Sequence, residues 1–599
     1  MDNQLKEIVL EFFNENDELS IKLRQVSSSE EARQVALQYV QSYEDKTIHS
    51  NYIAHPMERS IARRSIIVLK NIFSKRSEEL TDFSAIEALW KLSNGKGYTD
   101  KSVTPAFVMD IKHLFLGMKG KTGLFVVDEN LDADDNLSGR TISKKRSDTL
   151  DKIAKGAQDW VGKYKSGLEK DVIEKRLKNK ERIKNYFNAT EDEWNDWNWQ
   201  CRNVLRDLET TSNVINLTDE EKKAIKIAKE KHLPYGITPY YAMLMDEETH
   251  RDNDHAVRAQ VLPPLKYAEM MVSAKDSGLE DLDFMGEHDT SPEDLITRRY
   301  PMISIFKPHN TCSQICVYCQ RNWEIDDVLD EKAQAPKSKL DKALDWYKNH
   351  PQVTEILVTG GDPAIMSDAV FKKILDRISE LEHIKRIRIG TRIPVVMPMR
   401  ITDEFADLLA AYHIPGEREV CVMTHFEHTY EVSPEAMEAI QKLRARKIAV
   451  YNQGVFTLEN ARKFEMVALR KVLRSIGVDP YYTFNTKGKE ETKDYRVPIA
   501  RLLQEQTEEA RLNPGLERTD EAVYNIPRLG KNYLRAGQDH EVIMVLPTGE
   551  RVYEFYPWDI STEDTSPYLH TDLAIDDFLQ NLKARGEDVT DYSSIWYYL

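Results

Sequence analysis

The 599-residue sequence predicts an α/β protein built on a partial (β/α)6 barrel. Six short apolar runs, rich in β-branched and aromatic residues, follow residue 302, and stretches with helical periodicity separate them. Strands that alternate with helices pair in parallel through right-handed crossovers. Polar residues also follow the runs at their carboxyl ends, which is the edge where such barrels gather their chemistry. The agreement of these two patterns is stronger evidence than any single motif.

The predicted strands lie, in chain order, at residues 303–307 (ISIFK), 355–361 (EILVTGG), 384–392 (IKRIRIGTR), 419–426 (EVCVMTHF), 448–456 (IAVYNQGVF) and 480–486 (PYYTFNT). Segments such as DAVFKKILDRISELE and SPEAMEAIQKLRARK supply the helices between them. The polar residues at the strand ends are a cysteine-containing loop, Gly360-Gly361-Asp362, Thr391-Arg392, Thr424-His425, Asn452-Gln453 and Asn485-Thr486-Lys487.

Composition and turn signals divide the chain into four predicted segments. Residues 1–185 form a helical N-terminal extension whose role the sequence does not reveal, and residues 186–295 form a helical lead-in. The barrel occupies residues 296–490, and residues 491–599 carry a predicted β-hairpin, EVIMVLPTGERVYEFY. In the lead-in, a capping box at Thr190 begins one predicted tryptophan-rich helix, WNDWNWQCRNVL. The histidines of the polar linker that follows, His250 and His255, are expected to be solvated.

The composition excludes several classes of partner. The formal net charge is −17, which does not favour nucleic acid or anionic lipid. The N-terminus is charged throughout, and no run of about 18 apolar residues occurs, so neither a secretory signal nor a membrane span is expected. Only five cysteines are present and three of them are clustered, which indicates a reducing, cytoplasmic compartment.

The clustered cysteines have the spacing Cys312-x-x-x-Cys316-x-x-Cys319, directly after the first predicted strand. Three thiolates at this spacing can bind one 4Fe–4S cluster and leave one iron open to an outside molecule. Buried core thiols and a zinc site with a remote fourth ligand are the alternatives. A core role would not concentrate three of five cysteines within eight residues.

Two further candidates are ambiguous when taken alone. Gly360 and Gly361 permit close backbone approach, and Asp362 can hold either a strand end or a cofactor. Lys531 has two interpretations. It is either an ordinary surface lysine or a residue that binds an aldehyde cofactor covalently.

From about residue 186 to 560 the chain resembles the lysine 2,3-aminomutase family of radical S-adenosylmethionine (SAM), pyridoxal-phosphate (PLP) enzymes. The matching motifs are WNDWNWQCRN, ITPYYAMLMD, RRYP, the cysteine loop, GGDPAIMSD, IRIGTRIPVVMPMRIT, MTHFEH, YNQGV and PYY, in this order. The resemblance implies that the barrel is the radical SAM barrel. It also implies an isomerase with three cofactors: a 4Fe–4S cluster, SAM and PLP.

The resemblance also implies roles for individual residues. Cys312, Cys316 and Cys319 match the cluster ligands. Gly360, Gly361, Asp362, His425 and Gln453 match the SAM site. Lys531 matches the lysine that binds PLP covalently, and Arg299 and Tyr300 match other PLP-binding residues. Arg321 matches the arginine that binds the substrate α-carboxylate, for which a planar guanidinium is well suited.

The chain departs from the lysine enzymes where the substrate side chain is bound. Two aspartates of those enzymes correspond here to Lys487 and, after a one-residue gap, to Asn525. An ammonium and an amide suit a side-chain carboxylate and repel a lysine substrate, as in glutamate 2,3-aminomutase. The alternative is that Lys487 points to solvent. A family arginine four residues past Arg299 is replaced by Ile303, so the residues that bind the PLP phosphate must differ in part.

These residues together predict a 2,3-aminomutase that converts L-glutamate to β-glutamate. An aminomutase for lysine, arginine or aspartate, and a radical SAM enzyme that acts on a macromolecule through its N-terminal extension, are the alternatives. A small amino acid substrate, an external electron donor of the flavodoxin or ferredoxin type and a homo-oligomer are the expected partners.

Overall fold

The structure is a computed structural model that describes residues 3–50, 52–53, 55–96, 103–125, 139–277, 282–486, 488–527, 530–536, 540–556 and 566–599. The chain divides into two compact units, the smaller made of residues 1–155, 497–508 and 532–599 and the larger of residues 156–496 and 509–531. The four segments predicted from the sequence divide the chain by composition and remain a prediction. Among the described residues, no helix is both long and apolar enough to cross a membrane.

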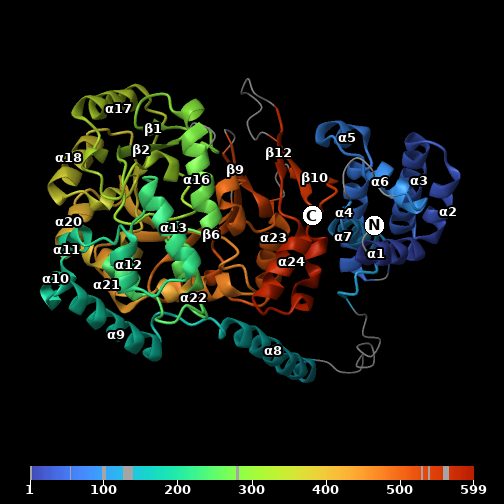
Figure 1. Ribbon diagram of the computed structural model, residues 1–599, viewed down its shortest axis with the longest axis horizontal. Coiled ribbons are helices and arrows are strands. Elements are labelled where there is room, and N and C mark those ends of the chain that lie inside the picture. Colours follow the sequence, from blue (N-terminus) through green and yellow to red (C-terminus); the bar gives the residue numbers. More distant parts are fainter. Residues whose placement is uncertain are drawn as a thin grey trace. The chain divides into compact units, whose positions relative to one another are not determined.

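One nine-stranded sheet organises the larger unit, with its strands in sequence order (Figure 1). The strands are β1 (Ile296–Thr297), β2 (Ile303–His309), β3 (Glu355–Gly360), β4 (Arg386–Gly390), β5 (Glu419–Thr424), β6 (Ala449–Phe456), β7 (Asp479–Asn485), β8 (Glu521–Ile526) and β9 (Gly530–Tyr533). Each strand from β2 to β7 pairs in parallel with the next, and β1 is antiparallel to β2. The six predicted parallel strands are confirmed as β2 to β7, and the curled sheet is a partial barrel that β8 and β9 extend.

Side chains alternate between the two faces of this sheet, as β2 illustrates. Ser304 and Phe306 are buried, and both contact Tyr347 of the outer helix α17 (Lys337–Asn349). The alternate residues Ile303 and Lys307 are only half-buried and therefore face the concave side. The polar groups of β2 to β7 that project from this concave face are the ones available to a ligand inside the barrel.

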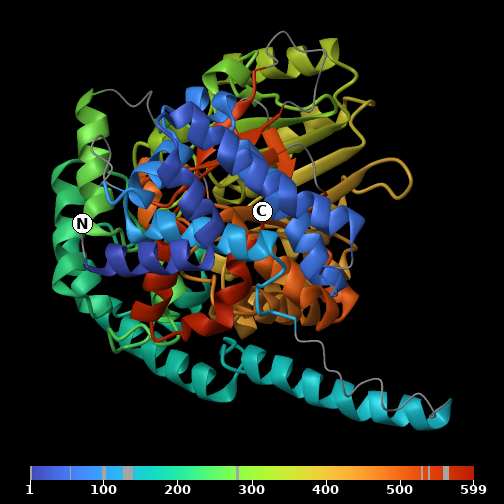
Figure 2. The same cartoon turned by 90° about the vertical axis from the view of Figure 1, so that its right-hand side faces the viewer.

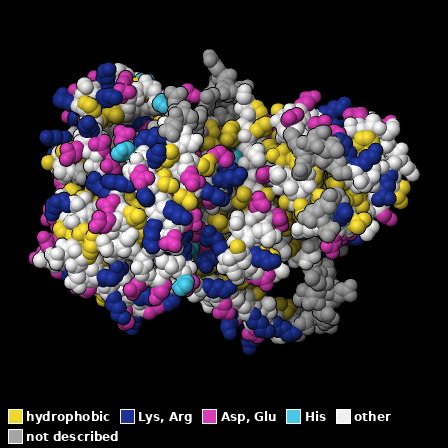
Figure 3. Space-filling view, viewed as in Figure 1, with side chains coloured by type: hydrophobic (Ala, Val, Ile, Leu, Met, Phe, Trp, Pro, Cys, Tyr) yellow, Lys and Arg dark blue, Asp and Glu magenta, His cyan; other side chains and the backbone are white. Residues whose placement is uncertain are grey.

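Helices follow the strands as the sequence predicts. They are α17, α18 (Asp368–Ser379), α20 (Asp403–Ala410), α21 (Pro434–Ala445) and α22 (Glu465–Ser475). The side chains of Ser367, Thr402 and Ser433 accept hydrogen bonds from backbone N–H groups in the first turns of α18, α20 and α21. Figure 3 shows acidic and basic side chains interspersed over the face of the larger unit that it draws.

The lead-in region before the barrel is helical, as predicted. It contains α9 (Lys170–Phe187), α10 (Glu191–Asn195), α11 (Trp197–Arg202), α12 (Leu208–Val214), α13 (Asp219–Glu230), α14 (Pro239–Met243), α15 (His255–Ala259) and α16 (Leu265–Ser277). The capping box at Thr190 is present. However, the prediction of one tryptophan-rich helix is wrong. The backbone is extended at Asp196, and the Asp196 carboxylate caps a second helix, α11. Trp194 and Trp199 are buried, as expected for core residues.

The smaller unit joins the N-terminal helices to the C-terminal hairpin (Figure 2). Its helices are α1 (Asn3–Glu15), α2 (Asp17–Gln25), α3 (Ser29–His49), α4 (Pro56–Ile72), α5 (Lys75–Thr81), α6 (Ala85–Ser93), α7 (Pro105–Met118), α23 (Ile499–Glu508) and α24 (Ile575–Ala584), and α8 (Arg140–Val161) runs from this unit into the larger one. The predicted hairpin is confirmed as β10 (His540–Val545) and β11 (Arg551–Phe555), and β12 (Tyr568–Thr571) completes its sheet. Gly549 closes the turn with a φ of +95°.

A buried ion pair ties the hairpin to α7. The guanidinium of Arg551 donates to the carboxylate of Asp110 at 2.8 and 2.9 Å and to the carbonyl of Trp596 at 2.8 Å. Both side chains of the pair are at most 2% exposed. The apolar C-terminus therefore packs within this unit.

Removing the carboxylate of this pair is expected to destabilise the smaller unit strongly. Asp110→Ala leaves the Arg551 guanidinium buried without its counter-charge, so we expect the free energy of unfolding to fall by about 3–5 kcal/mol. Urea denaturation measures the change. Asp45→Ala, at an exposed position on α3, is the control and should change stability by less than about 0.5 kcal/mol. Equal effects of the two substitutions would contradict the importance of the pair.

Candidate active site

The three clustered cysteines lie in the loop that follows β2, and neighbouring segments hold this loop through its backbone. The amide of Ile315 donates to the carbonyl of Gly236 at 3.0 Å, and the amide of Val317 donates to Gln260 at 2.7 Å. All three thiols are free and half-buried. They are therefore available as ligands on a loop whose conformation the surrounding fold determines.

The separation of the three sulfur atoms favours a cluster over a single metal ion. Among the described residues, the three thiols do not gather within 4.8 Å of one another as ligands of one ion would. Zinc–sulfur bonds of about 2.3 Å would require such a close group. In a cubane cluster each cysteine binds a different iron, so the sulfur atoms lie farther apart. The residues fit the cluster.

The Gly360-Gly361-Asp362 motif fastens the end of β3 to the cysteine loop. A Cβ at Gly361 would lie 2.1 Å from the carbonyl oxygen of Thr311, and one at Gly360 would lie 2.5 Å from that of His309. The carboxylate of Asp362 accepts hydrogen bonds from the Thr391 hydroxyl at 2.6 Å and from the backbone of Ala364 and Arg392. The glycines thus allow two segments of this chain to approach, and Asp362 holds the end of β4.

Arg392 is a site residue whose role the sequence did not reveal. Its Nη1 donates to the sulfur of Cys316 at 2.8 Å, and its Nε donates to the carbonyl of His425 at 3.1 Å. Its Nη2 donates at 2.6 Å to Glu431, which is fully buried. Burial raises the pKa of the Cys316 thiol, and the guanidinium opposes that rise. A charged residue at the carboxyl end of a barrel strand was the available signal.

The two other residues expected at the SAM site lie at the ends of adjacent strands. His425 follows β5, and its side chain is 34% exposed, while Gln453 is half-buried on β6. The register Thr424↔Asn452 places the two residues at equivalent heights on the sheet. Next to them, the hydroxyl oxygen of Thr424 is buried without a hydrogen-bond partner among the described residues. The Thr424 hydroxyl at this edge of the sheet can therefore form a hydrogen bond with a ligand.

Glu427 lies beside His425, with 4.0 Å between its carboxylate and the histidine Nδ1, and is buried. Its other oxygen accepts a hydrogen bond from the amide of Val455 at 2.6 Å. Burial raises the pKa of Glu427 from 4.5 to about 8. At pH 7 the side chain is therefore mostly protonated in the folded protein.

This shift predicts a pH-dependent loss of stability. Between pH 4.5 and 8 the folded state holds a proton on Glu427 that the unfolded state has lost, so stability decreases as the pH rises through this window. Glu427→Gln, which resembles the neutral acid, should remove this decrease, about 3–4 kcal/mol between pH 5 and 8. Urea unfolding at several pH values measures it. Glu438→Gln, at an exposed position, should leave the profile unchanged.

Lys531 lies on β9 inside the larger unit and is enclosed by aromatic rings. Its Nζ is 4.7 Å from the ring centre of Tyr300 and 5.2 Å from that of Tyr482. The Lys531 amide donates to the Tyr300 hydroxyl at 2.6 Å. Burial and the positive charges of Arg388 and Arg299 lower the pKa of Lys531 to about 8. The structure thus brings three expected PLP residues together.

Arg321 and Arg299 both contact one carboxylate, that of Glu287, which the sequence did not single out. Arg321 Nη1 lies 2.5 Å from Glu287 Oε2, and Arg299 Nη2 lies 3.4 Å from Oε1. Burial alone would raise the pKa of Glu287, but these arginines and Lys307 lower it to about 2. Glu287 is therefore ionised at neutral pH and holds the cations together.

The two residues that set the expected substrate preference are only partly visible. Lys487 lies outside the described residues. Asn525 is half-buried on β8, the strand that neighbours both β7 and the Lys531-bearing β9. Its position in the sheet is compatible with a contact to a ligand near Lys531.

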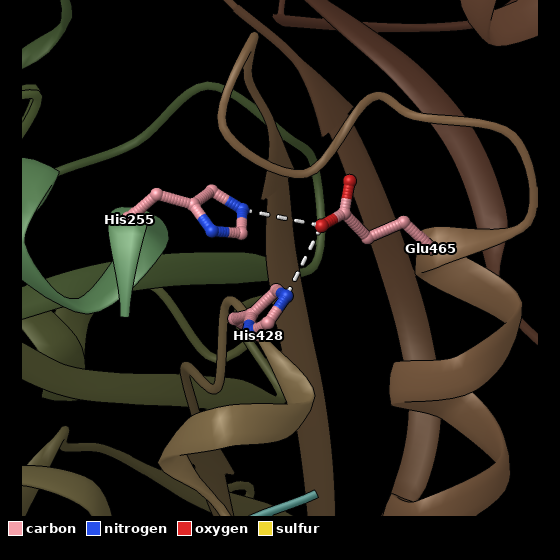
Figure 4. Close-up of side chains that lie close together, drawn as sticks. All are labelled: His255, His428 and Glu465. Atoms are coloured by element: carbon pink, nitrogen blue, oxygen red, sulfur yellow. Dashed lines mark hydrogen bonds and ion pairs between the residues drawn. The ribbon is translucent and has the colours of Figure 1, made fainter. Parts of the chain in front are cut away.

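A buried cluster outside this site contains His255, which was wrongly expected to be solvated. The Nε2 atoms of His255 and His428 lie 3.3 and 3.1 Å from one oxygen of Glu465 (Figure 4). Arg462 donates to the same oxygen at 2.7 Å. His428 Nδ1 accepts from the amide of Tyr430, so its Nε2 carries the proton and has no lone pair for a metal. The cluster is an ion-pair network.

Comparisons with known proteins agree with this geometry. Residues 306–503 match the Radical SAM superfamily model. An uncharacterized KamA family protein of Methanocaldococcus jannaschii is 43% identical over 98% of this chain and 97% of its own length. Glutamate 2,3-aminomutase of Clostridioides difficile is 35% identical over 56% of this chain and 74% of its own length. L-lysine 2,3-aminomutase of Methanococcus maripaludis is 33% identical over 53% and 70%, respectively.

Proposed function

This chain belongs to the KamA family of radical SAM proteins, and we propose that it is an amino acid 2,3-aminomutase that converts L-glutamate to β-glutamate. The proposal is supported by contacts that run from the cysteine loop to Glu287 and by the electrostatic effect of Arg299 on Lys531. The sulfur of Cys319 accepts from the Arg321 amide at 3.4 Å, and Arg321 and Arg299 both contact Glu287. Arg299 in turn lowers the pKa of Lys531. These interactions support one site that binds both the cluster and PLP.

In this proposal Cys312, Cys316 and Cys319 hold the cluster, and Arg392 fixes the position of Cys316. A 4Fe–4S cluster and SAM would together supply the radical chemistry that removes hydrogen from an unactivated carbon. His425 and Gln453 contact SAM together with Gly360, Gly361 and Asp362, the motif that fastens the end of β3 to the cysteine loop. A flavodoxin- or ferredoxin-type protein supplies the electron.

PLP supplies an aldehyde that binds amines and a conjugated ring that stabilises a neighbouring radical. Lys531 binds this aldehyde, and its lowered pKa keeps a useful fraction of the amine neutral. Tyr300 fixes the backbone of Lys531 through its hydroxyl. Arg321 binds the substrate α-carboxylate, and its buried Nε is without a hydrogen-bond partner among the described residues.

The substrate is proposed from the residue types at two positions. The chain is similar to both glutamate and lysine aminomutases at nearly equal identity, so overall similarity does not choose between them. Lys487 and Asn525 offer an ammonium and an amide to a side-chain carboxylate. A lysine substrate would meet like charge at Lys487, which costs several kcal/mol if the pair is desolvated.

The test is to reconstitute the protein anaerobically with iron, sulfide, PLP, SAM and a reductant, and to offer L-glutamate and L-lysine separately. NMR should show β-glutamate and no β-lysine. The double variant Lys487→Asp, Asn525→Asp should lose at least about 100-fold in glutamate turnover and gain activity on lysine. Lys493→Asp, at an exposed position, is the control for the change from lysine to aspartate. β-Lysine from the unaltered protein would refute the proposed substrate.

A further inference from the structure

A cluster of three cations, all mostly shielded from solvent, surrounds the carboxylate of Glu287. Lys307 Nζ lies 3.2 Å from Glu287 Oε2, which Arg321 also contacts, and Arg299 contacts the other oxygen. The three cationic side chains are 8–14% exposed. Glu324 adds a second carboxylate, which lies 3.7 Å from Lys307 and also forms an ion pair with Arg321. Three cations against two carboxylates leave one buried positive charge, which favours an anionic ligand.

The cluster also keeps unused hydrogen-bond donors. The Nε atoms of Arg299 and Arg321 and the Nη2 atom of Arg299 are buried and make no hydrogen bond among the described residues. Leaving such donors unsatisfied is costly, so they are usually occupied by a ligand or by water. Guanidinium N–H groups bind the oxygens of phosphates and carboxylates well. The donors and the net charge indicate the same kind of ligand.

Lys307 can supply the positive charge that is missing at Ile303, where the family has an arginine. Both residues lie on β2 with their side chains on the concave face, because four residues separate them and side chains alternate. The two Cα positions are roughly 13 Å apart along the strand. Lys307 nevertheless reaches the carboxylate that Arg299 contacts, so its ammonium lies within the same cluster. A cation is thus present although Ile303 is not one.

We propose that Arg299, Lys307 and Arg321 form one binding site for an oxyanion, in which Lys307 supplies the cation that Ile303 lacks. Glu287 is a positioning residue that holds the three cations together. The oxyanion is the phosphate of PLP or the carboxylate of the amino acid substrate. These ligands follow from the proposed function, and the charge and free donors of the cluster are independent of it.

The first experiment compares Lys307→Met with Lys307→Arg by titrating each protein with PLP and with pyridoxal, which lacks the phosphate. For a phosphate site, Lys307→Met should weaken PLP binding about 10- to 100-fold, Lys307→Arg should stay within about 3-fold, and pyridoxal binding should not change. For a carboxylate site, PLP binding should not change, and KM for the amino acid should rise by a similar factor at nearly constant kcat. Unchanged PLP binding and unchanged KM would overturn the proposal.

A second variant distinguishes the loss of a binding cation from a folding defect in Lys307→Met. Ile303→Arg in the Lys307→Met background returns a cation to the same face of β2, and should restore the lost affinity. A folded double variant that stays as weak as Lys307→Met would contradict the compensation. Lys339→Met, at an exposed position of α17, is the matched control and should change nothing.

A third measurement separates this proposal from the aminomutase assignment. If the unaltered protein does not bind PLP, the assignment fails, and inorganic phosphate becomes the probe. Phosphate that raises the Tm of the unaltered protein and of Lys307→Arg, but not of Lys307→Met, would still support the oxyanion site. Absence of any phosphate effect in the unaltered protein would then overturn it.

Discussion

Replacing Lys531 with alanine is expected to abolish covalent PLP binding and to reduce turnover by at least about 1000-fold. The side chain is enclosed by Tyr300 and Tyr482, and its amine is the nucleophile available there among the described residues. Loss of the visible absorbance of lysine-bound PLP measures the effect. Lys471→Ala, at an exposed position on α22, is the control and should bind PLP normally. An unchanged spectrum in Lys531→Ala would remove this residue from the mechanism.

The lowered pKa of Lys531 also predicts how the rate of PLP attachment depends on pH. With a pKa of about 8, roughly one amine in ten is neutral at pH 7, compared with roughly one in 3000 for an ordinary lysine. Only the neutral amine attacks an aldehyde, so the rate of PLP attachment should rise with pH through about 8 and level off above 9. Lys531→Arg keeps the positive charge but cannot deprotonate, and should remain inactive at every pH.

Much of the fold could be predicted because its signals are local. Alternating apolar runs and helical segments predicted β2 to β7, and Thr190 and the residues of the Thr-Gly turn predicted a helix start and a hairpin. The tryptophan-rich helix was wrong because the carboxylate of Asp196 offers the backbone an alternative to continuing the helix. β8 (Glu521–Ile526) was not predicted as a strand.

The candidate site was predictable where one motif carries the chemistry, as for the three cysteines. It was not predictable where a residue acts through partners that are distant in the sequence. Glu287 meets Arg321 34 residues later, and Glu431 meets Arg392 across the ends of adjacent strands. His255 was assigned to solvent because no local pattern shows that Glu465, 210 residues away, lies beside it. Such contacts depend on the tertiary fold.

Replacing Cys316 with alanine is expected to prevent the protein from holding a complete cluster and to abolish turnover. The three cysteines are the thiols of the loop after β2, so the loss of one leaves a second iron without a protein ligand. Iron and sulfide analysis after anaerobic reconstitution should fall from about four irons per chain to well below that number. Turnover should fall at least about 1000-fold, because no other described group can replace the cluster's chemistry.

The damage from Cys316→Ala should remain local, which makes the result interpretable. Arg392 loses one hydrogen bond but keeps its contacts with His425, Glu431 and Tyr241, so the charge of Glu431 remains compensated. The far-UV spectrum and the midpoint of urea unfolding should therefore change little. Cys201→Ala, on α11 and remote in sequence from the loop, should retain the full iron content. Equal iron in Cys316→Ala and Cys201→Ala would show that the cluster is bound elsewhere or not at all.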